Sequence, residues 1–227
     1  MKTIGILGGL GWESTSSYYK IMNLYIREKL GNLHSIDAII YSMNFESLQA
    51  PLKEGDWDTI TKALIEKSKQ IEQAGAGFLL IASNAAHKVA SEIKDSLNIP
   101  FLHIATPIAK AIEKDQVTKV GIIGTSVTMN NTFYKDKLNN QVELITPDKE
   151  EQNIIQNIIF KDLLQDKLEE TTKKDFLSVV SHLQKKGAQK IILGCTELTD
   201  LAFLESPSLF YDSTVLYAKA AVDYSLQ

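Results

Sequence analysis

The chain has 227 residues, enough for one large domain or for two of about 110 residues each. Its hydrophobic fraction of 44%, its net charge of −4 and the lack of a dense Lys/Arg cluster indicate a globular protein and exclude a nucleic-acid-binding footprint. No apolar run approaches the roughly 18 residues of a membrane span, and the short apolar N-terminus has no small-residue cleavage site. We therefore expect a cytoplasmic protein with neither a membrane nor a nucleic-acid partner.

Short apolar runs alternate with longer amphipathic stretches along the chain. In chain order, the predicted strands are Thr3–Leu7, Ala38–Ser42, Phe78–Ala82, Phe101–His103, Lys119–Gly124, Val142–Ile145, Lys190–Gly194 and Leu209–Tyr211. The predicted helices between and after them are Ser14–Leu30, Trp57–Ala74, His87–Leu97, Pro107–Lys114, Thr132–Leu138, Lys149–Gln165, Thr171–Lys186 and Ser213–Leu226. Strands that are apolar on both faces and alternate with helices are typical of α/β proteins with parallel sheets.

The sequence also contains an internal repeat. Lys2–Gly9 is echoed by Lys119–Gly124, with Gly5 matching Gly121 at a separation of 116 residues. Gly75–Asn84 is echoed by Gly187–Thr196 at a separation of 112. Two matches in the same order, each near half the chain length, indicate a duplication. The sequence therefore predicts two related α/β halves.

A duplicated parallel sheet has a consequence for function. The functional crevice of an open parallel sheet lies at the carboxyl ends of its strands. If the two halves face each other, equivalent strand ends lie on opposite sides of one cleft. The equivalent residues are Ser83 and Cys195, followed directly by Asn84 and Thr196.

Cys195 is the only cysteine, so it forms no internal disulfide and no thiolate metal cluster. It lies where a strand ends, in Gly194-Cys-Thr-Glu197, with Thr196 as the expected N-cap of the next helix. Free backbone N–H groups there would favour a thiolate and lower the pKa of the thiol from about 8.5. A buried structural cysteine is the alternative reading.

Ser83 is expected at the matching strand end, where a serine is often only a cap. Asn84 can offer its side-chain amide and its backbone N–H to a bound anion. His87 is one helical turn downstream and is expected to be structural rather than a base, whereas His103 is a weaker cleft candidate. No spacing of histidines predicts a metal site.

The opening Gly8–Gly11 segment lacks the full dinucleotide-binding spacing and has no convincing acidic partner at the end of the next strand. It predicts a tight turn that exposes the N-terminus of the helix after it. The duplicate of this turn offers Thr125 and Ser126. Together, hydroxyls and amides from these loops would hold a small anionic ligand, without a nucleotide cofactor.

Several motifs along nearly the whole chain resemble the aspartate/glutamate racemase family. They are Ile-Gly-Ile-Leu-Gly-Gly at 4–9, Trp-Glu-Ser-Thr at 12–15, Asn84 with His87-Lys88, Gly124-Thr125 with Thr128-Met129, and Gly194-Cys-Thr-Glu197. The resemblance implies two pseudo-symmetric α/β domains, residues 1–98 plus about 212–227 and residues 99–211, with the active site in the cleft between them. It also implies a homodimer that racemises acidic amino acids without pyridoxal phosphate or another cofactor.

The resemblance further implies roles for single residues. Cys195 would be the base that acts on the L-enantiomer, and the α-carboxylate would be bound by Ser83, Asn84, Ala85, Thr125 and Cys195–Thr196. The sequence departs from the family pattern because Ser83 replaces the first cysteine. A serine hydroxyl is too weak an acid to rest as an alkoxide base, although it can donate a proton to a carbanion. We therefore expect a reaction that favours the L-enantiomer as substrate.

The second departure is a shortage of arginine. Arg27 is the only one, so Lys53 or Lys161 would have to bind an acidic side chain; otherwise the substrate side chain is not acidic. Two further readings stay open: a one-thiol decarboxylase or isomerase of the same superfamily, and a binding protein with impaired turnover. A cysteine-to-serine substitution made to trap a ligand would leave the same residue at position 83.

Overall fold

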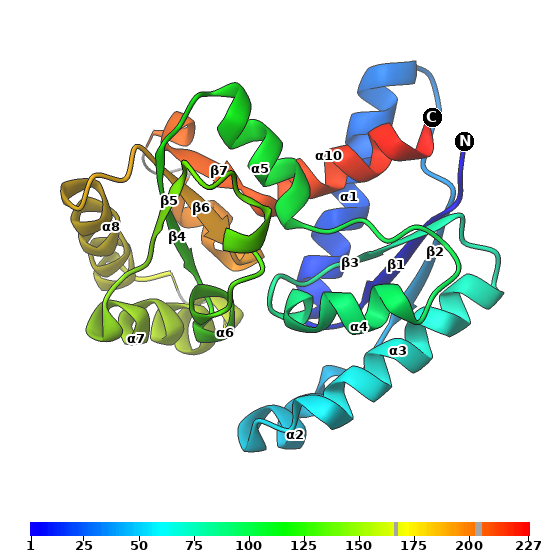
Figure 1. Cartoon of the computed structure of the whole chain (residues 1–227), viewed down its shortest axis with the longest axis horizontal. Coiled ribbons are helices and arrows are strands. Elements are labelled where there is room, and N and C mark those ends of the chain that lie inside the picture. Colours follow the sequence, from blue (N-terminus) through cyan, green and yellow to red (C-terminus); the bar gives the residue numbers. More distant parts are fainter. Residues whose placement is uncertain (166–167, 203–205) are drawn as a thin grey trace. The chain divides into compact units, whose positions relative to one another are not determined.

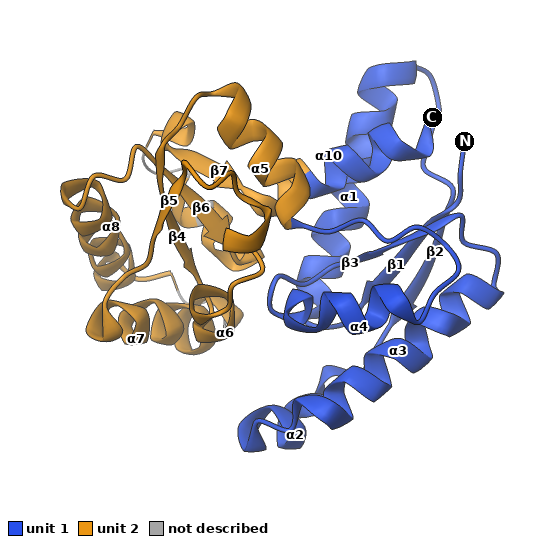
Figure 2. Cartoon of the chain, viewed as in Figure 1, with its two compact units in different colours: residues 1–104, 217–227 blue, residues 105–216 orange. Residues whose placement is uncertain are grey.

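The computed structural model describes residues 1–165, 168–202 and 206–227. The chain forms two compact α/β units, Met1–Ile104 with Tyr217–Gln227 and Ala105–Leu216 (Figure 2). Each unit contains one all-parallel sheet flanked by helices, which confirms the predicted fold class. The domain limits expected from the sequence, at 98/99 and about 211/212, stay a prediction.

The first unit contains a sheet in the order β2-β1-β3. Its strands are β1 (Ile4–Gly8), β2 (Ala38–Ser42) and β3 (Phe78–Ile81), and its helices are α1 (Trp12–Leu30), α2 (Gln49–Glu54), α3 (Trp57–Gln73), α4 (Ala90–Asp95) and, from Tyr217 on, α10 (Ser213–Ser225). In Figure 1, α3 and α4 lie on one side of these strands and α1 and α10 on the other. The core under α3 joins Leu7 of β1 to Leu64 and Ile71.

The second unit contains a sheet in the order β5-β4-β6-β7. Its strands are β4 (Lys119–Gly124), β5 (Glu143–Ile145), β6 (Lys190–Gly194) and β7 (Phe210–Asp212), and its helices are α5 (Ala105–Lys114), α6 (Ser126–Asn130), α7 (Lys149–Asn157), α8 (Glu170–Lys185) and α9 (Thr199–Ala202). Phe176 and Leu183 of α8 pack on Ile191 and Leu193 of β6 in one buried cluster. Both sheets thus place the first strand of their unit in the interior and cover it with a long helix.

The two units share the turn that leads into the strand carrying each candidate residue. Gly75 and Gly187 have φ angles of 98° and 99°, in the left-handed region that favours glycine. Their N–H groups donate to the carbonyls of Glu72 and Gln184, both at 2.9 Å. The same backbone conformation with the same hydrogen bond, 112 residues apart, supports the duplication.

A second shared feature is the glycine in the first strand of each unit. A Cβ atom on Gly5 would lie 2.6 Å from Cγ2 of Ile71, and one on Gly121 would lie 3.2 Å from Cδ1 of Leu183. Each glycine therefore lets the long helix, α3 or α8, pack close to its strand.

Two predicted elements differ in the structure. The segment predicted as a helix at Thr132–Leu138 forms a 3₁₀ turn at Lys135–Lys137 instead. An α-helix that was not predicted, α6, begins at Ser126 directly after β4, where Thr125 caps it and accepts a hydrogen bond from the Thr128 N–H at 3.4 Å. In place of a strand at Phe101–His103, only Phe101 bridges to Leu79. The chain then turns away, because the Ile104 N–H donates to a side chain rather than to the sheet.

Other predicted limits shift by a few residues. The segment expected as a helix at His87–Leu97 starts as a 3₁₀ turn at Ala85–Val89 and continues as α4. The helix expected at Lys149–Gln165 is α-helical only to Asn157, followed by a π-helical turn at Ile158–Asp162. Within the described residues, the helices are too short or too polar for any of them to cross a membrane.

Candidate functional site

Ser83 lies just beyond the carboxyl end of β3, after the buried Ala82. Its Oγ accepts a hydrogen bond from the Ala86 N–H at 3.5 Å. Asn84 is buried and Ala85 half-buried at the start of the 3₁₀ turn. The serine hydroxyl therefore has the cap contact that a strand-end serine commonly makes, and it is half-buried.

His87 fixes the backbone of Ser83. Its Nε2 accepts from the Ile104 N–H at 3.2 Å, so the ring proton is on Nδ1, which donates to the Ser83 carbonyl at 2.8 Å. Burial, with a smaller contribution from His103, lowers the pKa of His87 to about 3. The imidazole is neutral near pH 7 and both nitrogens are engaged. His87 is therefore a structural residue, as the sequence predicts, rather than a base.

Tyr217 supports the same strand end from α10. Its ring lies 5.6 Å from the His87 ring, and its hydroxyl accepts from the Ile81 N–H at 3.4 Å. The same hydroxyl donates to the Leu102 carbonyl. Sequence reasoning missed Tyr217, because it lies more than a hundred residues from β3 and carries no local motif.

The glycine-rich turn after β1 is held by a hydroxyl. The Gly9 N–H donates to Thr15 Oγ1 at 2.8 Å, and Gly9 has a φ angle of 75°. A Cβ atom there would lie 2.1 Å from the Met43 carbonyl oxygen, so only glycine fits. Trp12 begins α1 and its side chain is 68% exposed, so it is not packed in the core of its unit.

Cys195 directly follows Gly194, the last residue of β6, in an extended conformation. Its buried thiol donates to Oε2 of Glu197 at 2.8 Å. The Thr196 hydroxyl donates to the same oxygen at 2.8 Å. The prediction that Thr196 caps a helix is therefore wrong: its hydroxyl binds Glu197, and Cys195 occupies the cap position of the following 3₁₀ turn.

The environment of Cys195 favours the neutral thiol. Burial is the largest cause, and the nearby Glu197 carboxylate adds to it, so the pKa of the thiol is raised well above its usual range. Backbone N–H groups of Glu197 and Thr196 act in the opposite direction but are outweighed. The prediction of a lowered pKa is therefore wrong, because it counted the amides and omitted burial and the carboxylate.

Thr125 lies at the end of β4 and acts as the N-cap of α6. Its hydroxyl lies 3.2 Å from the Thr128 hydroxyl, and the Ser126 N–H donates to Oε1 of Gln156 at 2.8 Å. Of the amides expected to bind an anion, those of Ser126 and Thr128 already have partners inside the unit. A ligand there would have to use Thr125 itself or displace these contacts.

The remaining charged candidates lie on the surface. Lys53 is exposed at the end of α2, and Lys161 is exposed in the π-helical turn after α7. His182 of α8 lies 2.6 Å from Oε1 of Glu151, as part of the contact between α7 and α8. Across 1–165, 168–202 and 206–227, no three or more His, Cys, Asp or Glu side chains are grouped to hold a metal ion.

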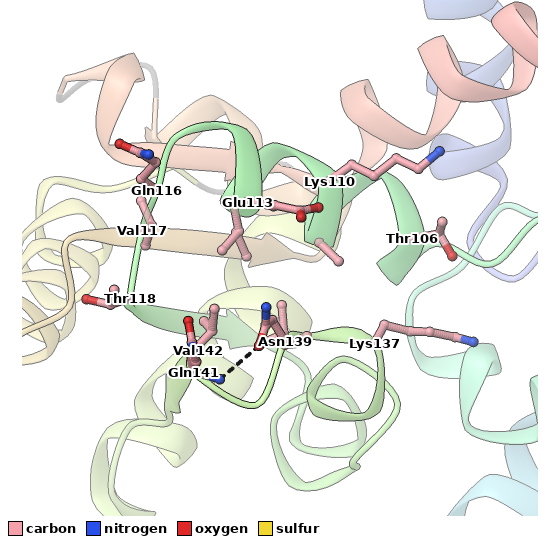
Figure 3. A pocket seen from close by; sticks show the side chains of 13 residues that line it. Thr106, Lys110, Glu113, Gln116, Val117, Thr118, Lys137, Asn139, Gln141 and Val142 are labelled. Atoms are coloured by element: carbon pink, nitrogen blue, oxygen red, sulfur yellow. Dashed lines mark hydrogen bonds between the residues drawn. The ribbon is translucent and has the colours of Figure 1, made fainter.

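A hollow of about 640 Å³ lies in the second unit, between α5 and residues 137–142. Figure 3 shows Glu113 and Val117 on one side, facing Asn139 and Val142 on the other. None of the predicted catalytic or substrate-binding residues lines it.

Comparisons with known proteins agree with this architecture. The family model described as Asp/Glu/Hydantoin racemase matches residues 7–221. The chain is 28% identical to the broad specificity amino-acid racemase RacX of Bacillus subtilis over 225 residues, which cover 96% of each chain. Among solved structures, a proposed Asp/Glu racemase from Yersinia pestis (35% identity, TM-score 0.91) and an aspartate racemase homologue from Pyrococcus horikoshii OT3 (30% identity, TM-score 0.84) are each similar over 100% of both chains.

The model match covers nearly the whole chain, both duplicated units included. It also includes the strand ends that carry Ser83 and Cys195. The chain therefore belongs to the Asp/Glu/Hydantoin racemase family.

Proposed function

We propose that this chain is a cofactor-independent amino-acid racemase that acts on L-aspartate, L-glutamate or a related amino acid. In this proposal Cys195 removes the α-proton from the L-enantiomer and Ser83 supplies a proton to the opposite face. The observation that carries the proposal is the duplication: Ser83 and Cys195 follow corresponding strands, β3 and β6, of two units built alike. Membership of a racemase family supports an isomerase.

The proposed chemistry needs one acid or base on each face of the α-carbon. Asn84, Ala85, Thr125 and Thr196 would hold the α-carboxylate through side-chain and backbone donors, as Ser83 and Cys195 act on the α-carbon. A thiol can alternate between base and acid, whereas a serine hydroxyl serves mainly as a donor. Ser83 would regain its proton from water. α-Proton exchange with water would therefore be faster from the L-enantiomer than from the D-enantiomer.

The preferred side chain follows from the charges available. Arg27, the only arginine, is exposed on α1, which leaves Lys53 and Lys161 as the proposed partners of an acidic side chain. If neither lysine binds it, the enzyme would accept uncharged side chains. The name of the Bacillus subtilis relative, a broad specificity racemase, supports testing amino acids of both kinds.

Three further parts of the proposal concern the setting of the enzyme. We propose that it is cytoplasmic, that it serves amino acid metabolism, and that it is a homodimer. Analytical ultracentrifugation at micromolar concentration tests the last point, because a dimer has twice the 25.3 kDa mass of the chain.

A second candidate is a one-thiol decarboxylase or isomerase of the same superfamily. The single cysteine favours it, because one thiol is sufficient to protonate an enolate from one face. A binding protein that retains the site without turnover is the third candidate. Such a protein would bind an amino acid without exchanging its α-proton.

The test incubates the protein in deuterated water with the L- and D-forms of aspartate, glutamate and several neutral amino acids. NMR measures the exchange of the α-proton, and chiral chromatography measures the inversion. Exchange with inversion supports the racemase. Exchange with retention would mean that Cys195 works without Ser83. Binding of an amino acid without any exchange would refute the proposal in favour of a binding protein. Cys195→Ala is expected to abolish all exchange.

A further inference from the structure

A carboxylate lies against the thiol that the reaction needs. Cys195 Sγ and Thr196 Oγ1 both donate to Oε2 of Glu197, each at 2.8 Å. We propose that Glu197 is the positioning residue for Cys195: its carboxylate accepts the thiol proton, so that Cys195 becomes a base without releasing a proton to water. This proposal rests on the proposed racemase function for its kinetic consequence, but the thiol–carboxylate coupling itself can be measured without turnover.

The geometry explains why such a partner is needed. The thiol is buried, and burial together with the carboxylate raises its pKa, so near neutral pH Cys195 holds its proton. The thiolate is the form that can take a proton from carbon. Loss of the thiol proton to bulk water would leave two adjacent negative charges in a buried site. Transfer of the proton to Glu197 leaves one.

Every proton moved in the proposed reaction has a defined donor and acceptor. The S–H bond of Cys195 breaks, its electron pair stays on sulfur, and the proton binds Oε2 of Glu197. The thiolate then takes the α-proton, and the electron pair of the C–H bond stays on the substrate as a carbanion conjugated with its carboxylate. Ser83 donates a proton to the other face and regains one from water, while Glu197 returns its proton to water.

Thr196 has a defined part in this arrangement. Its hydroxyl binds the same carboxylate oxygen as the thiol does, and the 3₁₀ turn Thr196–Leu198 keeps the three residues together. The Leu198 N–H donates to the Cys195 carbonyl at 3.3 Å and closes that turn. The carboxylate is therefore held at the thiol by local backbone structure.

Other titratable groups of this unit lie on neighbouring elements. Asp212 of β7 accepts from the Thr199 hydroxyl at 2.9 Å and from the Val215 N–H at 3.0 Å. The phenol of Tyr134, in the segment after α6, is buried, and burial raises its pKa. Of the charged groups in the described part of the unit, Glu197 is the one that shifts the pKa of Cys195.

The coupling is tested by alkylation of Cys195 with iodoacetamide from pH 6 to 9.5, followed by intact mass, in wild type, Glu197→Gln, Glu197→Asp and Glu150→Gln. The chain has one cysteine, so the mass reports this thiol alone. We expect the alkylation rate of wild type to be nearly flat from pH 6 to 8.5, because the thiolate forms inside the pair, and that of Glu197→Gln to rise about tenfold per pH unit, because its thiol must ionise to water. Glu197→Asp is expected to keep a nearly flat profile. Glu150 is exposed on α7, so Glu150→Gln serves as the matched control for loss of one charge and is expected to react like wild type.

Proton transfer within the pair has a kinetic signature. When the proton stays inside the pair, the thiolate fraction does not depend on pH, so the α-proton exchange rate of wild type should be nearly flat from pH 6 to 8.5. In Glu197→Gln the thiol must ionise to water, and the rate should rise about tenfold per pH unit. Glu197→Asp should restore a flat profile at a lower rate.

The outcomes separate the two proposals. The same pH dependence of alkylation in wild type and Glu197→Gln, or a flat exchange profile in Glu197→Gln, would overturn the role of Glu197. If wild type exchanges no amino acid while its alkylation profile is flat and that of Glu197→Gln rises with pH, the coupling stands and the racemase proposal fails.

Discussion

Replacement of His87 by glutamine removes the buried imidazole behind Ser83. The ring joins the Ser83 carbonyl to the Ile104 N–H and has a pKa of about 3. A histidine in the unfolded chain has a pKa of about 6.5. Between about pH 6.5 and 3, His87 is therefore protonated in the unfolded chain but remains neutral in the folded chain. The stability that neutral His87 contributes is therefore fully present above about pH 6.5 and is lost as the pH falls from there toward 3.

The size of this effect follows from the two pKa values. At 1.36 kcal/mol per pKa unit, the free energy of unfolding of wild type should fall between pH 7 and 4.5 by about 2–3 kcal/mol more than that of His87→Gln. At pH 7 the variant should itself be less stable by about 1–3 kcal/mol, because glutamine cannot satisfy both backbone groups with the same geometry.

Urea denaturation, monitored by tryptophan fluorescence, is suited to this test. Both tryptophans, Trp12 and Trp57, lie in the unit that contains His87. The exposed His34, replaced by glutamine, is the control and should leave the wild-type pH dependence unchanged. If wild type and His87→Gln lose the same stability between pH 7 and 4.5, a neutral buried His87 is not part of the fold.

Three further predictions concern other parts of the molecule. Gly5→Ala should destabilise the first unit by about 2–3 kcal/mol, because its new Cβ atom would lie 2.6 Å from a side-chain atom of Ile71. Gly121→Ala should destabilise the second unit by about 1 kcal/mol, because its closest contact would be 3.2 Å. Urea denaturation combined with hydrogen exchange measures the stability of each unit. Asp148→Ala should cost about 0.5–2 kcal/mol in a urea titration, because Asp148 and Glu151 cap each other's N–H groups at the start of α7; an unchanged midpoint would contradict that cap. Cys195→Ala should leave the free energy of unfolding within about 1 kcal/mol of wild type while α-proton exchange falls to background, and residual exchange would show that another group is the base.

Much of the fold follows from local sequence patterns. The glycines at 75 and 187 mark the same turn in both halves, and short-range backbone geometry alone determines that turn, so the repeat predicts it. The segments at 101–103 and 132–138 are different. Their apolar residues suit a strand and a helix, but hydrogen bonds to distant groups, such as His87 Nε2 with the Ile104 N–H, decide where the chain turns.

The candidate site shows the same division. The sequence identifies Ser83 and Cys195 as equivalent strand ends, because both strands and turns are repeated. It cannot give the protonation of the thiol, because that depends on burial and on the direction of the Glu197 side chain. Tyr217 escapes prediction for a similar reason, since its contacts with Ile81 and Leu102 join segments far apart in the chain.

We propose that Cys195 removes the α-proton of the L-enantiomer and that Ser83 makes α-proton removal from the D-enantiomer slow. The most direct measurement compares initial α-proton exchange rates from the L- and D-enantiomers of the best substrate in deuterated water, for wild type and for Ser83→Cys. We predict that wild type exchanges the L-enantiomer at least about tenfold faster, and that Ser83→Cys raises exchange from the D-enantiomer toward the L rate, because a thiol replaces a hydroxyl whose pKa is far higher. Equal rates from both enantiomers in wild type, or no gain from the D side in Ser83→Cys, would contradict the account.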